Sequence, residues 1–238
     1  MTAAVITSQY ASNNPTQRNR IINGAMVIDQ RNAGAATANT INDYTLDRWL
    51  VGQSTTGKLI AQQNAGSVTP PIGFTNYLGI TSQSSYSVGS ADYYLINQRI
   101  EGFNSADLNW GTANAKTVTL SFQVYSSLTG TFGGSISNGA FNYSYPFSYT
   151  VSSANTWTTI TITIPGPTSG TWIGATNGIG IRVYFGLGIG STYSGTANAW
   201  AASGYLSTTG ATSVVGTAKA TFYITGVQLE AGTTATPF

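Results

Sequence analysis

The side chains that could do chemistry are few in this chain of 238 residues, which has nine basic and seven acidic groups. Seven of these sixteen charges fall within residues 18–48: Arg18, Arg20, Asp29, Arg31, Asp43, Asp47 and Arg48. An arginine fork binds a carboxylate through paired hydrogen bonds, and charges within a sheet persist when they are paired. We therefore expect a polar network that stabilises the fold or a contact between subunits.

Arg48 is the centre of this expected network. It lies in an Asp-Arg-Trp triplet and could pair with Asp29, Asp47 or Glu101, which would join the first strands to residues 98–102 (QRIEG). Contact with a ligand is the lesser alternative for these groups. The residues assigned to the network are Arg20, Asp29, Arg31, Asp47, Arg48, Arg99 and Glu101.

Cysteine and histidine are both absent from the sequence, which excludes disulfides, thiol nucleophiles, thiolate zinc sites and imidazole-dependent triads. A glycosidase would need two carboxylates across the scissile bond, but the sequence does not bring any two of its seven acidic residues together. We therefore expect no enzyme, no cofactor and no resident metal site, and leave open a single carbonyl-rich calcium site. Glycan cleavage stays an unfavoured alternative.

The charge pattern also limits the partners. The formal net charge is only +2 and no run of lysine or arginine occurs, so we expect no binding to nucleic acid. No apolar stretch approaches the roughly 20 residues that span a bilayer, and the N-terminus lacks a basic start followed by an apolar core. We expect neither membrane association nor a signal peptide, and hence synthesis in the cytoplasm.

Aromatic side chains are abundant in polar, loop-like stretches. Tyrosine and tryptophan rings stack on the apolar faces of sugars and anchor protein interfaces. The same rings could instead cover the ends of a sandwich or pack between subunits. The candidates for contact with a glycan or a protein partner are Tyr86, Tyr143, Tyr145, Trp172, Tyr193 and Trp200.

Alternation with a period of two predicts β-strands through most of the chain. Residues 118–125, 157–164 and 178–187 each place apolar side chains on one face, and the last of these is expected to be a central strand. The final strand changes phase at Gly226, where we predict a β-bulge. The Gly/Ser/Thr/Asn-rich residues 130–142, 165–178 and 188–217 are expected to be surface loops.

These patterns predict an all-β fold, a jelly-roll β-sandwich of about eight antiparallel strands spanning residues 18–238. Residues 1–17 are small and polar, and we expect them to form an extended attachment arm.

Three segments carry a resemblance to known proteins: NRIINGAMVIDQRNAG at residues 19–34, YTLDRW at residues 44–49 and the terminal ITGVQLEAGTTATPF. Together with QRIEG, they resemble a group of phage virion proteins found as tail-fibre, head-fibre and decoration components, in which such segments flank a variable middle. The order of the strands also resembles carbohydrate-binding modules of the jelly-roll type, which implies ligands on a concave sheet face or at the loops.

The resemblance implies a non-enzymatic protein of the virion surface, a capsid decoration or head-fibre protein that contacts host-surface polysaccharide. A tail-fibre tip that binds the host receptor is the alternative. The expected partners are further copies of the chain, for which we expect a homotrimer, and capsid or tail proteins.

Overall fold

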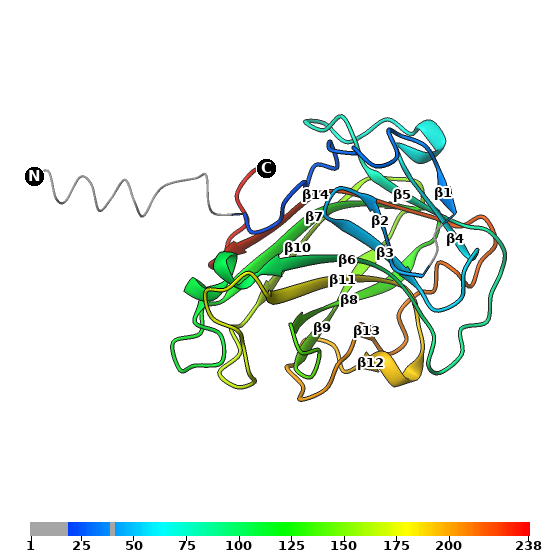
Figure 1. Cartoon of the computed structure of the whole chain (residues 1–238). Helices are drawn as coiled ribbons and strands as arrows, with labels where there is room; N and C mark the ends of the chain where they lie inside the picture. The colour runs from blue at the N-terminus through cyan, green and yellow to red at the C-terminus, as the bar shows by residue number, and fades with distance from the viewer. Residues whose placement is uncertain (1–18, 39–40) are drawn as a thin grey trace, which may run out of the picture.

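The computed structural model describes residues 19–38 and 41–238, which form two six-stranded sheets packed face to face (Figure 1). The expected arm, residues 1–17, lies outside the described residues. The described ranges contain four short 3-10 turns beside the strands: η2 (Ala65–Ser67), η3 (Gly102–Asn104), η4 (Ala106–Leu108) and η5 (Ser191–Tyr193). Within the described ranges, no helix has the length and apolar character needed to cross a membrane.

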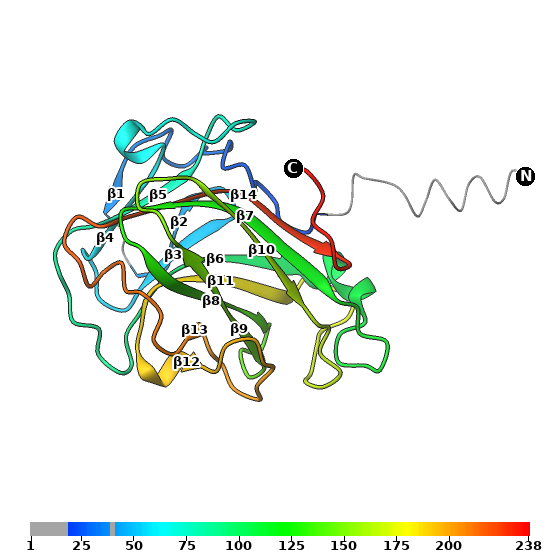
Figure 2. The same ribbon diagram turned by 180° about the vertical axis from the view of Figure 1, so that it is seen from behind.

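Each sheet is named here after its long central strand. The β14 sheet has the order β1 (Thr37–Ala38), β4 (Leu59–Gln63), β5 (Leu78–Ser82), β14 (Thr221–Ala231), β7 (Val118–Ser126) and β10 (Thr158–Ile164). The β11 sheet has the order β2 (Asp43–Leu46), β3 (Trp49–Gln53), β6 (Tyr93–Glu101), β11 (Ile179–Ile189), β8 (Gly130–Asn138) and β9 (Ser144–Val151). A short parallel pair, β12 (Ser194–Gly195) and β13 (Ser207–Thr208), lies beside the β11 sheet in both views (Figures 1 and 2).

All neighbours in the two large sheets are antiparallel, so the expected jelly-roll β-sandwich is confirmed, with more strands than the eight anticipated. The three strands predicted from alternation are β7, β10 and β11, and β11 is central, between β6 and β8. Their apolar faces meet in one core, where the rings of Phe122 and Phe185 from opposite sheets lie 5.0 Å apart. Burial of this shared face is the main stabilising term of the fold.

The predicted bulge is confirmed on β14. Pairing with β7 shifts register between Thr225 and Gln228, and Gly226 adopts a φ of +62°. The extra residue keeps Ile224 and Val227 on the buried side, although they have opposite parity in the sequence. Only glycine takes this backbone conformation without strain.

An N-terminal strap, residues 19–34, runs between the two sheets at one end of the sandwich. On the β14 side, the Arg20 amide donates to the Leu229 carbonyl at 2.9 Å, and the Val227 amide donates to Gly24 at 3.1 Å. On the β11 side, the Gln98 side chain accepts from the Ile22 amide at 2.8 Å and donates to the Ile22 carbonyl at 3.0 Å. The strap therefore joins the central strands of both sheets.

The C-terminal residues fold back onto β14 next to the strap (Figure 1). The Thr236 amide and hydroxyl donate to the two carboxylate oxygens of Glu230, at 2.9 Å and 2.7 Å. The Phe238 ring meets Phe74 edge-on at 5.1 Å. The segments that carry the sequence resemblance at the two ends of the chain are thus in direct contact.

The expectation of a loop at residues 130–142 is wrong for its first nine residues, because Gly130–Asn138 forms β8, which is buried between β11 and β9. The glycines of β8 are needed because residues from other segments lie very close to its backbone. A Cβ on Gly133 would collide with the Ser207 hydroxyl, and a Cβ on Gly134 would collide with the Tyr184 carbonyl.

The other two expected loops are largely irregular in the structure. Residues 165–178 form no strand or helix, and residues 188–217 are irregular apart from the end of β11, η5, β12 and β13.

We expect Gly226→Ala to destabilise the protein, because a Cβ there would lie 2.6 Å from the Phe74 ring and the φ is positive. Gly210→Ala is the matched control, with a φ of +77° and nothing within 4 Å. Overpacking should cost Gly226→Ala about 1–3 kcal/mol beyond the backbone term shared by both variants. Urea unfolding measures this difference, and equal losses would contradict the proposed packing role of the bulge.

Candidate functional site

The outer face of the β11 sheet is where polar and aromatic side chains converge. On β6, Leu95, Asn97 and Arg99 alternate with the inward Ile96 and Gln98, as expected for a strand. Register places Asn97 opposite Tyr184 and Arg99 opposite Arg182, so these side chains from β6 and β11 share the outer face.

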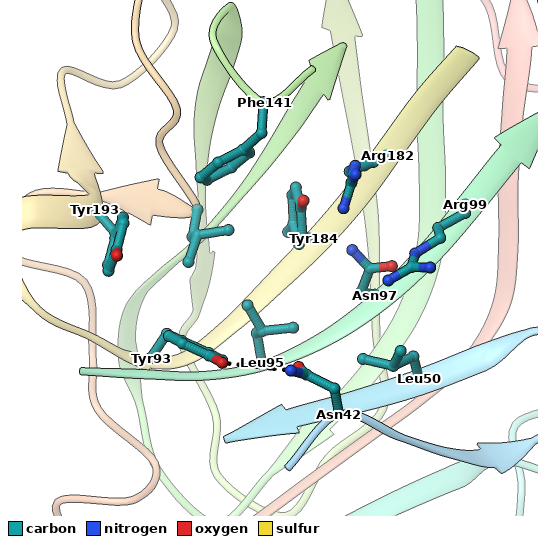
Figure 3. A pocket seen from close by; sticks show the side chains of 11 residues that line it. Asn42, Leu50, Tyr93, Leu95, Asn97, Arg99, Phe141, Arg182, Tyr184 and Tyr193 are labelled. Atoms are coloured by element: carbon teal, nitrogen blue, oxygen red, sulfur yellow. Dashed lines mark hydrogen bonds between the residues drawn. The ribbon is translucent and has the colours of Figure 1, made fainter. Parts of the chain in front are cut away.

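A hollow of about 250 Å³ occupies this face, and we call it the aromatic hollow (Figure 3). Aromatic rings gather toward one end, while the two guanidinium groups and Asn97 lie toward the other (Figure 3). Its lining residues are Asn42, Leu50, Tyr93, Leu95, Asn97, Arg99, Phe141, Arg182, Tyr184, Tyr193 and Leu206.

The long segment that carries β12 and β13 forms one wall of this hollow. It lies close to the sheet because Gly133 and Gly186 leave room for Ser207, whose side chain would contact a Cβ at either position. Leu206 is buried there against Leu95 and Tyr184. The sequence predicted a surface loop here with Tyr193 as a binding candidate, and Tyr193 and Leu206 of this segment line the hollow.

Three side chains of the aromatic hollow have buried polar atoms without a hydrogen-bond partner in the protein. They are Asn97 Oδ1, Arg99 Nε and Arg182 Nε, out of eight such atoms in the described part of the chain. A buried polar group without a partner is costly, so these three side chains of the hollow are polar groups which the protein does not fully satisfy. Burial raises the pKa of the Tyr184 phenol despite the opposing charges of Arg182 and Arg99, so its hydroxyl stays protonated.

A second hollow of about 390 Å³ adjoins the first at Arg99, which lines both. We call it the arginine hollow, and the two together the groove. Arg48 and Glu101 form an ion pair at 2.7 Å in this second hollow, and Arg48 also donates to the Arg99 carbonyl at 3.1 Å. Its lining residues are Arg31, Tyr44, Asp47, Arg48, Arg99, Ile100, Glu101, Asn177 and Ile179.

The network residues predicted from sequence fall into several separate contacts. Arg48 pairs with Glu101, one of the three carboxylates considered for it. Arg20 makes a two-pronged contact with Asp107, at 2.9 Å and 2.7 Å. Both are ion pairs within one chain, so they need no second subunit.

Of the remaining network residues, Asp29 and Asp47 are held by backbone amides and Arg31 lies against an aromatic ring, whereas Arg99 lines both hollows. Asp29 accepts from the Asn32 and Gly34 amides, and Asp47 accepts from the Gln30 amide. The Arg31 guanidinium lies 5.5 Å from the centre of the Tyr44 ring. Asp29 and Asp47 thus order the strap and its approach to β3.

Four of the six predicted aromatic candidates lie away from the groove in one cluster. Trp200 is its centre, with its ring 5.7 Å from Tyr143 and 5.2 Å from Tyr145, and its indole donates to the Pro165 carbonyl at 2.7 Å. Tyr145 is only 4% exposed, and Trp172 and Trp200 pack against the core. This cluster covers one end of the sandwich, and Trp172 also lines a hollow of about 180 Å³ beside Trp110.

Of the other two candidates, Tyr193 lies in the groove and Tyr86 lines neither of its hollows. Tyr193 lines the aromatic hollow and meets the Tyr93 ring edge-on at 6.3 Å. Tyr86 donates to Asp92 at 3.0 Å and lies under the Lys58 ammonium, 4.8 Å from it. Asn97, Phe141 and Arg182 were not predicted as binding residues. The alternation of Leu95, Asn97 and Arg99 along the sequence does indicate that these three side chains share one face of a strand.

The outer face of the β14 sheet carries a separate aromatic row. The rings of Tyr125 and Tyr223 stack at 5.3 Å, Tyr77 stacks on Tyr223 at 5.0 Å, and Trp157 meets Tyr77 edge-on at 5.5 Å. Residues 65–69 cover part of this row, since Tyr77 donates to the Ala65 carbonyl and Trp157 to the Thr69 carbonyl. Of these rings, Tyr125 and Trp157 are half-buried.

The described residues contain no group of three or more acidic side chains that could hold a metal ion. Burial of Glu101 disfavours its charged form, but the hydrogen bond and charge of Arg48 outweigh this, so the pKa of Glu101 is lowered. An ionised carboxylate already paired with arginine is poorly suited to act as the general acid of a glycosidase.

Comparison with known proteins was made at the level of sequence and of structure. No protein-family model matches the sequence, and no curated protein matches it. A proposed sugar-binding protein from Bacteroides thetaiotaomicron superposes with a TM-score of 0.51 at 11% identity, covering 90% of this chain and 100% of its own. This likeness agrees with the jelly-roll fold described above.

Two weaker similarities have TM-scores below one half. A family 11 carbohydrate-binding module of a cellulosomal cellulase from Clostridium thermocellum has a TM-score of 0.40 at 13% identity, covering 84% of this chain and 98% of that one. The enzymatically active domain of tailspike protein 4 from bacteriophage CBA120 has a TM-score of 0.46 at 11% identity, covering 90% of this chain. This chain spans only 21% of the tailspike chain.

The Arg48–Glu101 pair gives a prediction about stability and pH. Both side chains are about one third exposed, at 34% and 32%, so a double-mutant cycle with Arg48→Gln and Glu101→Gln should give a coupling of about 0.5–1 kcal/mol at neutral pH. Because the folded pKa of Glu101 is lowered, this stabilisation is present above the ordinary value of 4.5 and is lost as pH falls through the folded pKa. Urea unfolding of the four proteins at neutral and acidic pH measures it, and a coupling unchanged in acid would contradict the ion pair.

Proposed function

We propose that this chain is a non-enzymatic, carbohydrate-binding protein of a phage virion surface. The observation that carries the binding function is the groove on the β11 sheet, where the rings of Tyr193 and Phe141 lie toward one end of the aromatic hollow and the polar side chains of Asn97 and Arg99 lie toward the other (Figure 3). Sugar recognition requires this combination, an apolar surface for a ring face and polar groups for its hydroxyls. Two adjoining hollows suit a chain of several sugars better than a single small molecule.

The virion role is supported by the resemblance of the terminal segments to phage fibre and decoration proteins. In the structure these segments meet, because the strap pairs with β14 and the C-terminal residues fold back on it. Ile22, Val27 and Ile28 of the strap are 42%, 56% and 45% exposed. Exposed apolar side chains near one another support contact with another protein, here a second copy of the chain or a capsid protein.

Binding without cleavage is supported by the state of the carboxylates. The side chains that line the aromatic hollow in the described structure include no carboxylate. Those of the arginine hollow, Asp47 and Glu101, are engaged by the Gln30 amide and by Arg48. A capsid decoration or head-fibre role and a tail-fibre tip role both use such a groove, and the location on the virion decides between them.

We expect Tyr193→Ala to weaken glycan binding by about tenfold or more, since loss of a stacking ring removes on the order of 1–3 kcal/mol. Tyr125→Ala is the matched control, a half-buried tyrosine on the outer face of the β14 sheet. Binding of both variants to a glycan array and their melting temperatures are the measurements. A loss confined to Tyr125→Ala would move the site to the β14 sheet and contradict the proposed groove.

The attachment role is tested on virions. We expect deletion of residues 1–17 to leave the fold intact, because the strap, residues 19–34, makes the described contacts with both sheets, and to abolish incorporation into the particle. Imaging of purified virions with the full chain, with the deletion variant and without the protein measures this. Density on the capsid supports decoration, density on the tail supports a receptor-binding tip, and normal incorporation of the deletion variant contradicts an attachment arm.

A further inference from the structure

Two arginines face each other across the centre of the groove without a counter-charge. Arg99 on β6 and Arg182 on β11 are direct partners in the register of the sheet. Like charges at such positions repel each other and destabilise the sheet. Among the described residues the ion pairs are Arg20–Asp107 and Arg48–Glu101, so neither Arg99 nor Arg182 is neutralised by a carboxylate.

The protein also leaves these two guanidinium groups short of hydrogen bonds. The Arg99 guanidinium makes no hydrogen bond to a described residue, whereas Arg182 donates to the Gly139 carbonyl at 3.0 Å and interacts with the Tyr184 hydroxyl. Arg20 differs in its terminal nitrogens, which make two contacts with Asp107 and one with the Asn104 carbonyl, although its Nε also lacks a partner. Arg99 and Arg182 thus retain donors for a group that the protein itself does not supply.

The formal charges in the rest of the groove cancel, because Arg31 and Arg48 are balanced by Asp47 and Glu101. Arg31, Arg48, Arg99 and Arg182 line the two hollows, against the carboxylates Asp47 and Glu101, which leaves a formal excess of two positive charges. That excess equals the formal net charge of the whole chain, +2, in a protein with only 7% charged residues. A concave surface of one sign concentrates a ligand of the opposite sign.

We propose that the groove takes an acidic polysaccharide and binds an oxyanion substituent of one sugar between Arg99 and Arg182. This inference rests on the proposed function and adds the class of glycan. The planar guanidinium forks match the geometry of carboxylate, sulfate and phosphate oxygens. An anion between the two arginines also removes their mutual repulsion, while the neighbouring Asn97 amide and the rings of Tyr193 and Phe141 contact the neutral parts of the chain.

The first experiment is a glycan array with matched pairs. Each pair presents an oligosaccharide with uronate, sialate, sulfate or phosphate groups beside its carboxyl-reduced, desulfated or dephosphorylated counterpart. We expect binding to charged members and loss of binding to their neutral counterparts, and the array identifies which oxyanion is bound. Binding should also weaken as ionic strength rises, because the groove is partly open to solvent.

Arg99→Gln is the sharpest variant, because no hydrogen bond from the Arg99 guanidinium would be lost in the free protein. We expect its affinity for the charged glycan to fall by about tenfold or more, with an unchanged or raised melting temperature. Arg182→Lys keeps the charge and should retain part of the binding, whereas Arg182→Gln should not. Lys219→Gln, which removes one positive charge outside the groove, is the control and should bind as the unaltered protein does.

The outcomes separate the acidic-glycan inference from the proposed function. If neutral glycans bind, Tyr193→Ala abolishes that binding and Arg99→Gln does not change it, the groove binds sugar but the acidic-glycan inference is wrong. If Arg99→Gln unfolds the protein, the arginine pair is structural and the inference is overturned. If no member of the array binds, both the inference and the proposed binding function fail.

Discussion

The strap is the constraint on which the rest of the structure depends. A β-sandwich is stable only if its two sheets keep one relative position, and here residues 19–34 bind the middle of both. The Gln98 side chain holds the backbone of Ile22 as a neighbouring strand would, and the Trp49 indole donates to the Asn23 carbonyl at 2.9 Å. Because the strap and the C-terminal fold-back occupy one end of the sandwich, the outer face of the β11 sheet remains available.

That outer face has a different physical character from the core. Inside, aromatic and branched apolar side chains pack together, and no charged side chain lies among the core residues of the described structure. Outside, β6 and β11 bring like charges and an amide together, and small residues of β8 let the β12–β13 segment close over one side. A protein selected for stability alone would neutralise Arg99 and Arg182, as it does Arg20 and Arg48. The retained charges are therefore best explained by a ligand.

Much of the fold could be predicted from local pattern, because alternation reports which face of a strand is buried. This predicted β7, β10 and β11, and the phase change at Gly226 gave the bulge. The pattern failed at β8, where Gly133 and Gly134 are set by the close approach of Ser207 and Tyr184, residues distant in the sequence. The site was only partly predictable for the same reason. Tyr193 was selected as a binding residue and Arg99 as a member of the polar network, but the register that places Arg99 opposite Arg182 is a tertiary property.

The most direct test of the central claim is a crystal structure of the protein with an acidic oligosaccharide taken from the bound members of the array. We expect density for the oligosaccharide along the outer face of the β11 sheet, with an oxyanion within hydrogen-bond distance of Arg99 and Arg182 and a sugar ring beside Tyr193. Density over the aromatic row of Tyr125 and Trp157, or at the Trp172 and Trp200 end of the sandwich, would contradict it.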